Sequence, residues 1–149
     1  MTTIAIGCDP NAARLKEVLT KHLGGLGYGV EDFGSDDTIY ANTAIRVAEA
    51  VAAGKYPRGI LICGTGIGMS IAANKVPGAY AGLVSDPYSA ERAMKSNNTN
   101  IICFGAFTIG DEVAKSLLGI WLNSQYVSGG PSEPKVQRIY KYERDRGKG

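Results

Sequence analysis

The sequence predicts a three-layer α/β domain built around a parallel β-sheet. Five short apolar runs alternate with helical patterns along the 149 residues. The run at residues 60–63 reads Ile-Leu-Ile-Cys without alternation, as expected for a strand that is covered on both faces. Strands that are each followed by a helix form parallel sheets with helices on both sides. We therefore expect a single domain over residues 1–149, with no internal repeat and no linker.

The first unit of this pattern lies at the N-terminus. Residues 3–8 read as a buried strand because they are apolar up to the Asp that follows. Residues 11–28 have apolar residues at helical spacing and close on glycines, which predicts an amphipathic helix. The next short run, at residues 29–34, is the second expected strand.

The middle of the chain contains the most apolar strand. A helix is expected at residues 42–55, with Asn42 or Thr43 as its N-cap. The third strand follows at residues 58–64. After three glycines spaced two apart, residues 69–75 read as a short helix.

The last third of the chain continues the alternation. Two strands are expected at residues 80–85 and 99–105, and the residues between them have a helical pattern. A long helix is expected at residues 110–126, where Trp121 would pack into the core or a subunit interface. Residues 135–149 mix both signs of charge, which indicates a solvated terminal helix.

Composition excludes several classes of function. A net charge of +2 with dispersed basic residues provides no surface for nucleic acid or for an anionic membrane. The N-terminus has no signal-peptide pattern, and no apolar run approaches the roughly 20 residues of a membrane span. We therefore expect a cytoplasmic protein whose partners are neither nucleic acid nor membrane.

The cysteines and the single histidine indicate reduced thiols and no metal. Cys8, Cys63 and Cys103 are an odd number, lie far apart and each belong to an apolar run, which is not a disulfide pattern. Cys8 and Cys103 are expected in the core. There is no Cys-x-x-Cys pair, and His22, expected half-exposed on the first helix, is the only histidine, so no metal site is expected.

The glycine loop at residues 64–68 is the clearest candidate for a binding site. In parallel sheets, ligands bind beyond the carboxyl ends of the strands, and this loop follows the third strand. It lacks the Lys-Ser/Thr of a P-loop and the G-x-G-x-x-G of a dinucleotide site. The free N–H groups and the dipole of the helix that follows favour a negatively charged oxygen.

Cys63 ends the strand directly before this loop. A buried cysteine is most often a small core residue, whereas a thiol that faces a helix N-terminus has a lowered pKa and becomes reactive. A nucleophilic cysteine needs a histidine partner, and His22 lies midway along the first helix, away from the strand ends. A thiolate base remains as the alternative: it would remove a proton next to a carbonyl while amides hold the enediolate oxygen.

Together these motifs resemble a known family. "GILICGTGIGMSIAANK", with "IAIGCD" before it and "DPYSA", "NNTN" and "FG" after it, closely resembles the ribose-5-phosphate isomerase B family, which includes the galactose-6-phosphate isomerase subunits. The resemblance covers nearly the whole chain. It implies a five-stranded Rossmann-like α/β/α fold and a homodimer, or a dimer of dimers, with sites at the interface. It also implies aldose–ketose isomerisation of a sugar phosphate through an enediol, without metal or cofactor.

The resemblance also implies roles for individual residues. Cys63 becomes the expected catalytic base, and Asp9 and Thr65 the contacts to substrate hydroxyls and to the opening ring. Because segment 96–100 precedes the fifth strand, at the opposite edge of the sheet from Cys63, Asn97 is expected to reach the site of a partner subunit. The expected substrate-binding residues are Gly64, Gly66, Ile67, Gly68, Ser70, Tyr40, Ser96, Asn97, Lys135 and Arg138.

The chain departs from the family pattern at five positions, which are Pro10, Ser96, Phe107, Pro131 and Lys135. The first two stand where the family has histidines, and the one replaced by Ser96 is thought to open the sugar ring. The other three stand where the family has arginines, and those at 131 and 135 bind the phosphate. Lys135, and Arg138 one turn later, keep positive charge but lack the paired-arginine fork.

These departures leave the substrate open. Conversion of ribose 5-phosphate to ribulose 5-phosphate, a reaction of the pentose phosphate pathway, is the default expectation. A shifted substrate, such as a four-carbon sugar phosphate that needs no ring opening, is one alternative, and a non-catalytic module that binds sugar phosphates is another. A dinucleotide-binding domain is disfavoured by the glycine spacing.

Overall fold

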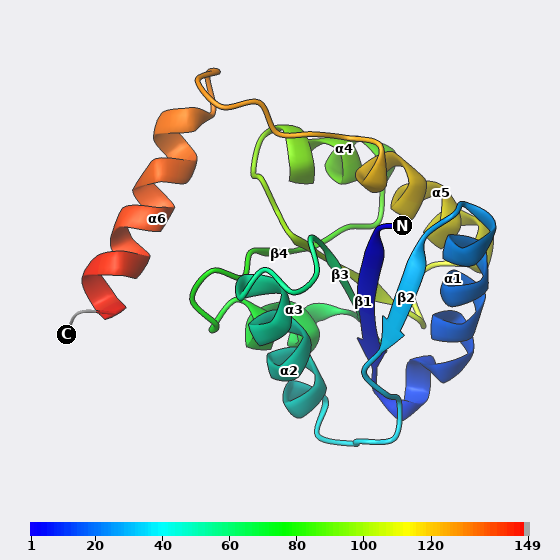
Figure 1. Cartoon of the computed structure of the whole chain (residues 1–149). Helices are drawn as coiled ribbons and strands as arrows, with labels where there is room; N and C mark the ends of the chain where they lie inside the picture. Colours follow the sequence, from blue (N-terminus) through cyan, green and yellow to red (C-terminus); the bar gives the residue numbers. More distant parts are fainter. Residues whose placement is uncertain (148–149) are drawn as a thin grey trace.

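The computed structural model describes residues 1–147 and has the expected three-layer α/β/α architecture (Figure 1). All strand pairs are parallel, in the order β2-β1-β3-β5-β4, which confirms the predicted fold class. The strands are β1 (Thr3–Cys8), β2 (Gly29–Asp32), β3 (Gly59–Cys63), β4 (Ala81–Leu83) and β5 (Ile101–Gly105). The helices are η1 (Pro10–Ala12), α1 (Ala13–Gly25), α2 (Tyr40–Ala52), α3 (Ile67–Ala73), α4 (Pro87–Lys95), α5 (Asp111–Leu122) and α6 (Glu133–Gly147).

Alternate side chains of β3 enter two different cores. Ile60 and Ile62 pack on the face that α1, α4 and α5 cover, whereas Leu61 and Cys63 pack on the face that α2 and α3 cover. Every residue of β3 is buried, which explains its unbroken apolar run. Cys63 therefore lies at the end of a rigid strand, on the α2–α3 face.

The residues expected in the core are there. Trp121 is fully buried, its Nε1 donates to Thr99 Oγ1 at 3.0 Å, and the Arg58 guanidinium lies 4.9 Å from the ring centroid. Cys8 and Cys103 are also fully buried. Burial raises the pKa of the Cys8 thiol to about 12 and raises that of Cys103 further, so both remain neutral.

The predicted N-cap of the second helix is wrong. α2 begins at Tyr40, so Asn42 and Thr43 lie inside its first turn. Asp37 organises this end instead, because its carboxylate accepts from the Ile39 N–H at 2.8 Å and from Asn42 Nδ2 at 3.0 Å. Asn42 is therefore bound by the preceding loop and caps nothing.

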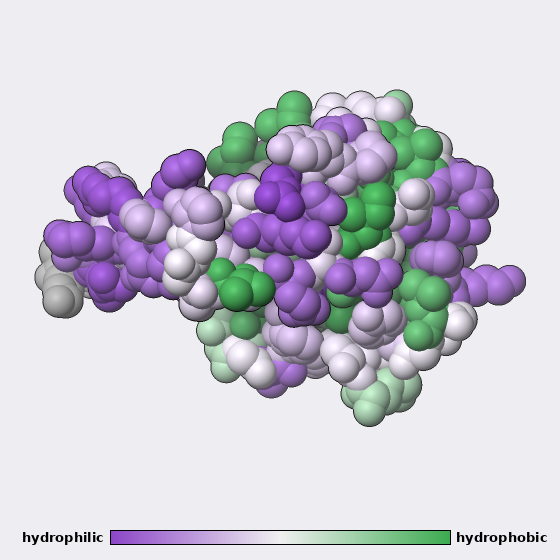
Figure 2. Space-filling model, turned by 90° about the horizontal axis from the view of Figure 1, so that it is seen from above, coloured by the Kyte–Doolittle hydropathy of each residue, from purple (hydrophilic) through white to green (hydrophobic). Residues whose placement is uncertain are grey.

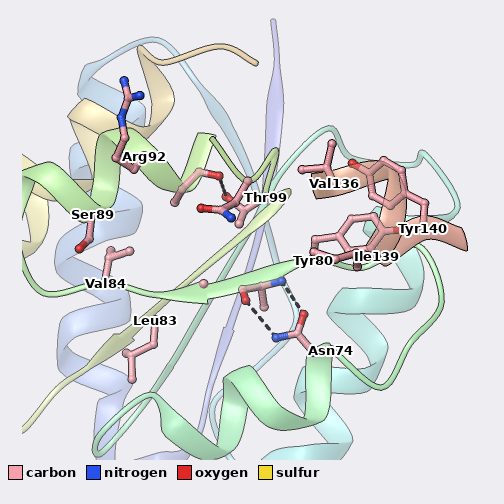
Figure 3. Close-up of a pocket in the computed structure, with 14 residues that line it drawn as sticks. Asn74, Tyr80, Leu83, Val84, Ser89, Arg92, Thr99, Val136, Ile139 and Tyr140 are labelled. Carbon is pink, nitrogen blue, oxygen red and sulfur yellow. Dashed lines mark hydrogen bonds between the residues drawn. The ribbon is translucent and has the colours of Figure 1, made fainter. Parts of the chain in front are cut away.

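β4 is an edge strand, and a side chain covers part of its outer edge. The Asn74 amide, just after α3, donates from Nδ2 to the Ala81 carbonyl at 3.0 Å and accepts from the Ala81 N–H at 2.8 Å (Figure 3). These are the bonds that a further strand would form with this residue.

α6 stands apart from the other helices, on the side of the molecule where β4 ends the sheet (Figure 1). Seen from above, it forms a largely hydrophilic projection (Figure 2). Val136 is its one buried residue within residues 133–147. Glu143 holds it to the domain by accepting from Tyr80 Oη at 2.6 Å and from the Gly78 N–H at 3.1 Å. Tyr140 also contacts the domain, because its hydroxyl accepts from Asn98 Nδ2 at 3.1 Å and its ring centroid lies 5.0 Å from that of Tyr80. A small set of side chains therefore fixes this helix to its own chain.

Candidate active site

Asp9 and Cys63 follow neighbouring strands, β1 and β3. The register pairs Cys8 with Ile62, and the Asp9 N–H donates to the Ile62 carbonyl at 3.2 Å, which places the two residues side by side. After β1 the chain adds β2 on one side of the β1–β3 pair, and after β3 it adds β4 and β5 on the other side. This is the point where the strand order reverses, and in open α/β sheets it is where ligands bind.

The Cys63 sulfur faces the start of α3. Cys63 is 6% exposed, and its Sγ accepts from the Gly66 N–H at 3.1 Å. Gly66 has a φ of +80°, and a Cβ there would stand 2.6 Å from Leu83 Cδ1 and 2.9 Å from the Phe104 carbonyl. Only glycine fits this turn, and because the turn is so tight, α3 begins at Ile67 rather than at the expected position 69.

The loop amides are not all free to bind an oxyanion, as the sequence led us to expect. The Gly66 N–H is bound to the sulfur, the Ile67 N–H donates to Thr65 Oγ1 at 3.3 Å, and the Ser70 N–H donates to the Gly66 carbonyl at 3.1 Å. The Gly68 N–H lies in the first helical turn, where no carbonyl of the helix precedes it. The Gly68 N–H and the Thr65 hydroxyl hydrogen are therefore among the donors that the loop can offer.

Two aromatic rings lie against this loop. A Cβ on Gly68 would come within 2.4 Å of Tyr40 Cε1 and Cζ, so the Tyr40 ring covers Gly68. The Phe107 ring lies beside Gly64 in the same way, at 3.0 Å from a Cβ there, and the Phe107 N–H donates to the Gly64 carbonyl at 2.9 Å. Tyr40, one of the expected substrate-binding residues, thus lies against the glycine loop, as does Phe107.

Asp9 has an unpaired oxygen. The residue is 7% exposed, and its Oδ2 accepts from Asn11 Nδ2 at 3.3 Å. Its Oδ1 is buried without a hydrogen-bond partner in the described part of the chain. A buried carboxylate oxygen without a partner is costly in folding free energy, which is typical of a group that binds a ligand.

Ser96, Asn97, Lys135 and Arg138 do not meet Cys63 within the chain. Ser96 and Asn97 follow α4, before the amino end of β5, whereas Cys63 is the last residue of the adjacent β3. Asn97 lines a cavity of about 390 Å³ between β4, α4 and α6 (Figure 3). Lys135 and Arg138 are exposed on α6. A complete site containing all of these residues would need a second chain.

Two residues of this region carried no signal in the sequence. Leu83 looked like an ordinary strand end, but it is 41% exposed, and its Cδ1 would lie 2.6 Å from a Cβ on Gly66. Arg92 looked like a solvated helix charge, but its Nε is buried without a partner. The one available clue was that Arg92 precedes Ser96 by four residues, since residues four apart lie on the same face of a helix.

The described residues give no sign of a metal centre or of a membrane segment. Between Met1 and Gly147, no three His, Cys, Asp or Glu side chains come together in a way that could hold a metal ion. Over the same residues, every helix is too short or too polar to cross a membrane. His22 lies half-buried beside Lys115 and does not approach Cys63.

Comparisons with known proteins match this chain along nearly its whole length. The family model described as Ribose/Galactose Isomerase matches residues 4–139, which include Asp9 and the loop after Cys63. The D-erythrulose-4-phosphate isomerase of Pectobacterium atrosepticum is 48% identical over 147 residues, 96% of each chain. The ribose-5-phosphate isomerase B of Escherichia coli is 44% identical over 98% of this chain and 99% of its own. The solved structure of Clostridium thermocellum ribose-5-phosphate isomerase B has a TM-score of 0.92 and 36% identity, covering 97% of this chain and 99% of that one.

Proposed function

Because the chain belongs to the ribose/galactose isomerase family, we propose that it interconverts the aldose and ketose forms of a sugar phosphate, preferably one with four carbons. One observation carries the proposal: the Cys63 sulfur and the unpaired Asp9 Oδ1 lie at the ends of adjacent strands. The first can accept a proton from carbon, and the second can accept a hydrogen bond from a sugar hydroxyl. An enediol reaction requires both.

Cys63 is the base in this reaction. As a thiolate it removes the proton from C2 of the aldose, the C2 electron pair forms the C1–C2 double bond, and the carbonyl electrons move to O1. A proton then moves from O2 to O1, and the sulfur returns its proton to C1 to give the ketose. The Gly66 N–H, which donates to Sγ at 3.1 Å, stabilises the thiolate.

The loop stabilises the charge that develops on O1. Donors that are already in place when the charge forms contribute most to such a step. The Gly68 N–H and the Thr65 hydroxyl hydrogen are suitable donors of the loop. Asp9 Oδ1 accepts from a sugar hydroxyl and so orients C2 toward the sulfur.

The four-carbon preference follows from how a substrate reaches its open form. A pentose 5-phosphate is mostly a closed ring, and an acid–base pair must open it before C2 becomes acidic. Pro10 and Ser96 supply no imidazole, and His22 lies on α1 away from Cys63. A tetrose 4-phosphate cannot close a five-membered ring because its O4 carries the phosphate. The name of the P. atrosepticum relative supports the same substrate class.

Ribose 5-phosphate is the second candidate, because the E. coli and C. thermocellum relatives carry its name. Initial rates would be compared for erythrose 4-phosphate, erythrulose 4-phosphate, ribose 5-phosphate and the corresponding free sugars. We expect kcat/KM for the tetrose phosphates to exceed that for ribose 5-phosphate by at least about tenfold. A higher kcat/KM for ribose 5-phosphate would refute the four-carbon preference and leave the isomerase proposal standing.

The role of Cys63 is tested with a matched cysteine. Cys63→Ala should lower kcat by about 10²- to 10⁴-fold, the usual contribution of a general base, and should stop solvent deuterium from entering the substrate. Cys8→Ala removes a buried thiol from the end of the neighbouring strand and should keep most of the activity. If Cys63→Ala keeps turning over substrate, the mechanism is wrong. If the wild-type protein is stabilised by sugar phosphates but exchanges no deuterium, it is a binding module.

We further propose that a second copy of the chain completes the site. Asn97 precedes the amino end of β5, whereas Cys63 ends the adjacent β3, and these five-residue strands are about 15 Å long. Exposed apolar side chains surround the loop and continue onto α6, namely Ile67, Ile71, Leu83, Ile139 and Tyr142. A dimer that buries them would also give α6 the contacts that its own chain does not provide.

Mixing two inactive variants tests this arrangement. If Cys63 of one subunit works with Asn97 of the other, Cys63→Ala and Asn97→Ala proteins refolded together should recover about a quarter of the wild-type activity, because half the dimers are mixed and each has one intact site. Sedimentation velocity gives the oligomeric state independently. A monomer, or a mixture as inactive as its components, would refute the shared site.

A further inference from the structure

A cavity of about 400 Å³ lies between the C-terminal end of α4 and the segment that leads into α6. Arg92 and Lys95 of α4 line it, together with Gln125, Pro131 and Ser132 of the segment. Within residues 1–147, these two cations are the only charged side chains that line it. A cavity whose charged lining groups are all cations favours an anion.

The Arg92 guanidinium has unused hydrogen-bonding capacity. Its Nη2 donates to Glu91 Oε1 at 3.1 Å and its Nη1 lies 3.4 Å from Ser96 Oγ, a long and weak contact. Its Nε is buried and has no partner in the described chain. A charged donor that is neither hydrated nor paired is unfavourable, and an oxyanion brought to the same edge of the guanidinium would satisfy it.

The head of this side chain is directed toward the cavity at the end of α4. In Figure 3 the aliphatic part of Arg92 starts beside Ser89, and the guanidinium points away from β4 and Leu83. Arg92 is the one residue within 1–147 that lines both this cavity and the neighbouring cavity of about 390 Å³, where Asn97 lies. The Asn97 N–H also donates to the Arg92 carbonyl, at 3.2 Å.

Two carboxylates, Glu91 and Glu133, lie near the cavity but do not line it. Glu91 is shared between Arg92 and Lys95, with Lys95 Nζ at 3.4 Å from Glu91 Oε2, so one negative charge faces two positive ones. Glu133 is held by the Tyr126 hydroxyl, which donates to its Oε2 at 2.6 Å. The two cations, and neither of these carboxylates, therefore line the wall of the cavity.

We infer that Arg92, assisted by Lys95, binds the phosphate group of the substrate. The inference rests on the proposed function, in which Asn97 reaches the sugar bound at the partner's Cys63. The Asn97 N–H donates to the Arg92 carbonyl, so Arg92 lies about one helical turn before Asn97. The planar guanidinium suits a phosphate because it donates in parallel to two oxygens. Lys135 and Arg138, which the sequence indicated for this role, are exposed on α6 and line neither cavity.

Titration with inorganic phosphate tests the inference without any turnover. Isothermal titration calorimetry should show that Arg92→Gln weakens phosphate binding by about 10- to 100-fold, the loss expected for hydrogen bonds to a charged group. Arg92→Lys should recover part of the affinity, since it keeps the charge and loses the fork. Lys135→Gln and Arg138→Gln should change it less than twofold. Lys141→Gln, which removes one exposed charge paired with Asp145, controls for net charge.

The same variants are then assayed with erythrose 4-phosphate. Arg92→Gln should raise KM in proportion to its loss of phosphate affinity and change kcat less, whereas a structural role would lower the melting temperature and spare KM. Phosphate binding by Arg92→Gln within twofold of wild type, or no phosphate binding by the wild-type protein, would overturn the inference. If no sugar phosphate is isomerised but Arg92→Gln still loses phosphate, the proposed reaction fails and the anion site stands.

Discussion

Replacing Gly68 by Ala would separate the geometry of the site from the stability of the fold. The added Cβ would stand 2.4 Å from Tyr40 Cε1 and Cζ and 2.6 Å from its hydroxyl oxygen. Carbon atoms pack at about 3.5–4.0 Å, so the ring must retreat by about 1 Å or more. Because Tyr40 is 40% exposed and starts its helix, we expect the ring to swing outward while the backbone stays in place.

The two effects have different magnitudes. Overpacking costs about 1–3 kcal/mol, and an exposed ring places this site at the low end. Ala is a better helix former than Gly by about 1 kcal/mol, so the two terms nearly cancel and the melting temperature should move by less than about 3 °C. A displacement of about 1 Å in a substrate-positioning wall, by contrast, lowers kcat/KM by about 10- to 100-fold.

The assay combines melting temperature and kcat/KM with erythrose 4-phosphate in two backgrounds. Gly68→Ala should lower activity in the wild-type background and have little further effect in Tyr40→Ala, where no ring remains to be displaced. Gly24→Ala in α1, where a Cβ meets no atom within 4 Å, is the matched control. If Gly68→Ala retains more than half the wild-type kcat/KM, or loses as much in the Tyr40→Ala background, Tyr40 is not a wall of the site.

Three further outcomes are expected. Phe107→Arg adds a cation beside the glycine loop, and Phe107→Ala is its control. The arginine variant should have the higher ratio of kcat/KM for ribose 5-phosphate to kcat/KM for erythrose 4-phosphate. An equal ratio in the two variants would contradict this. Asp32→Asn should cost about 1–2 kcal/mol by urea unfolding, because it leaves buried Lys16 unpaired. Partial burial raises the pKa of Asp32, but hydrogen bonds from Lys16 and the Gly34 N–H outweigh it and hold the pKa below its usual range, so this stabilisation is complete above about pH 4 and is lost as the pH falls further. Iodoacetamide at pH 8 should label Cys63 in the native protein and Cys8, whose pKa burial raises to about 12, only after unfolding; labelling at equal rates would contradict the contrast between the two thiols.

The sheet and the pairing of Asp9 with Cys63 were predictable because both depend on local pattern and a general rule. An unbroken apolar run such as β3 is typical of a strand that a parallel sheet buries on both faces, and residues that follow adjacent parallel strands meet at one edge. The N-cap of α2 was not predictable in the same way. Asn42 and Asp37 are both good capping residues, and only the path of the preceding loop decides between them.

The phosphate-binding role that we propose for Arg92 could not be read from the sequence either. Lys135 and Arg138 were expected to bind the phosphate, and the single chain leaves both exposed on α6. Arg92 had no distinguishing neighbour in the sequence, because the cavity that it lines is closed by a segment more than 30 residues further along the chain. Such a contact follows from tertiary packing, which local spacing does not determine.

The amide of Asn74 limits how copies of this protein can associate. By occupying the donor and acceptor of Ala81 on the outer side of β4, it leaves an approaching strand without its first pair of partners. This hinders two sheets from joining edge to edge into a continuous ladder, the route by which exposed strands start fibrils. Replacing Asn74 by Leu would open that route, so this one side chain protects a short, otherwise bare strand against aggregation at high protein concentration.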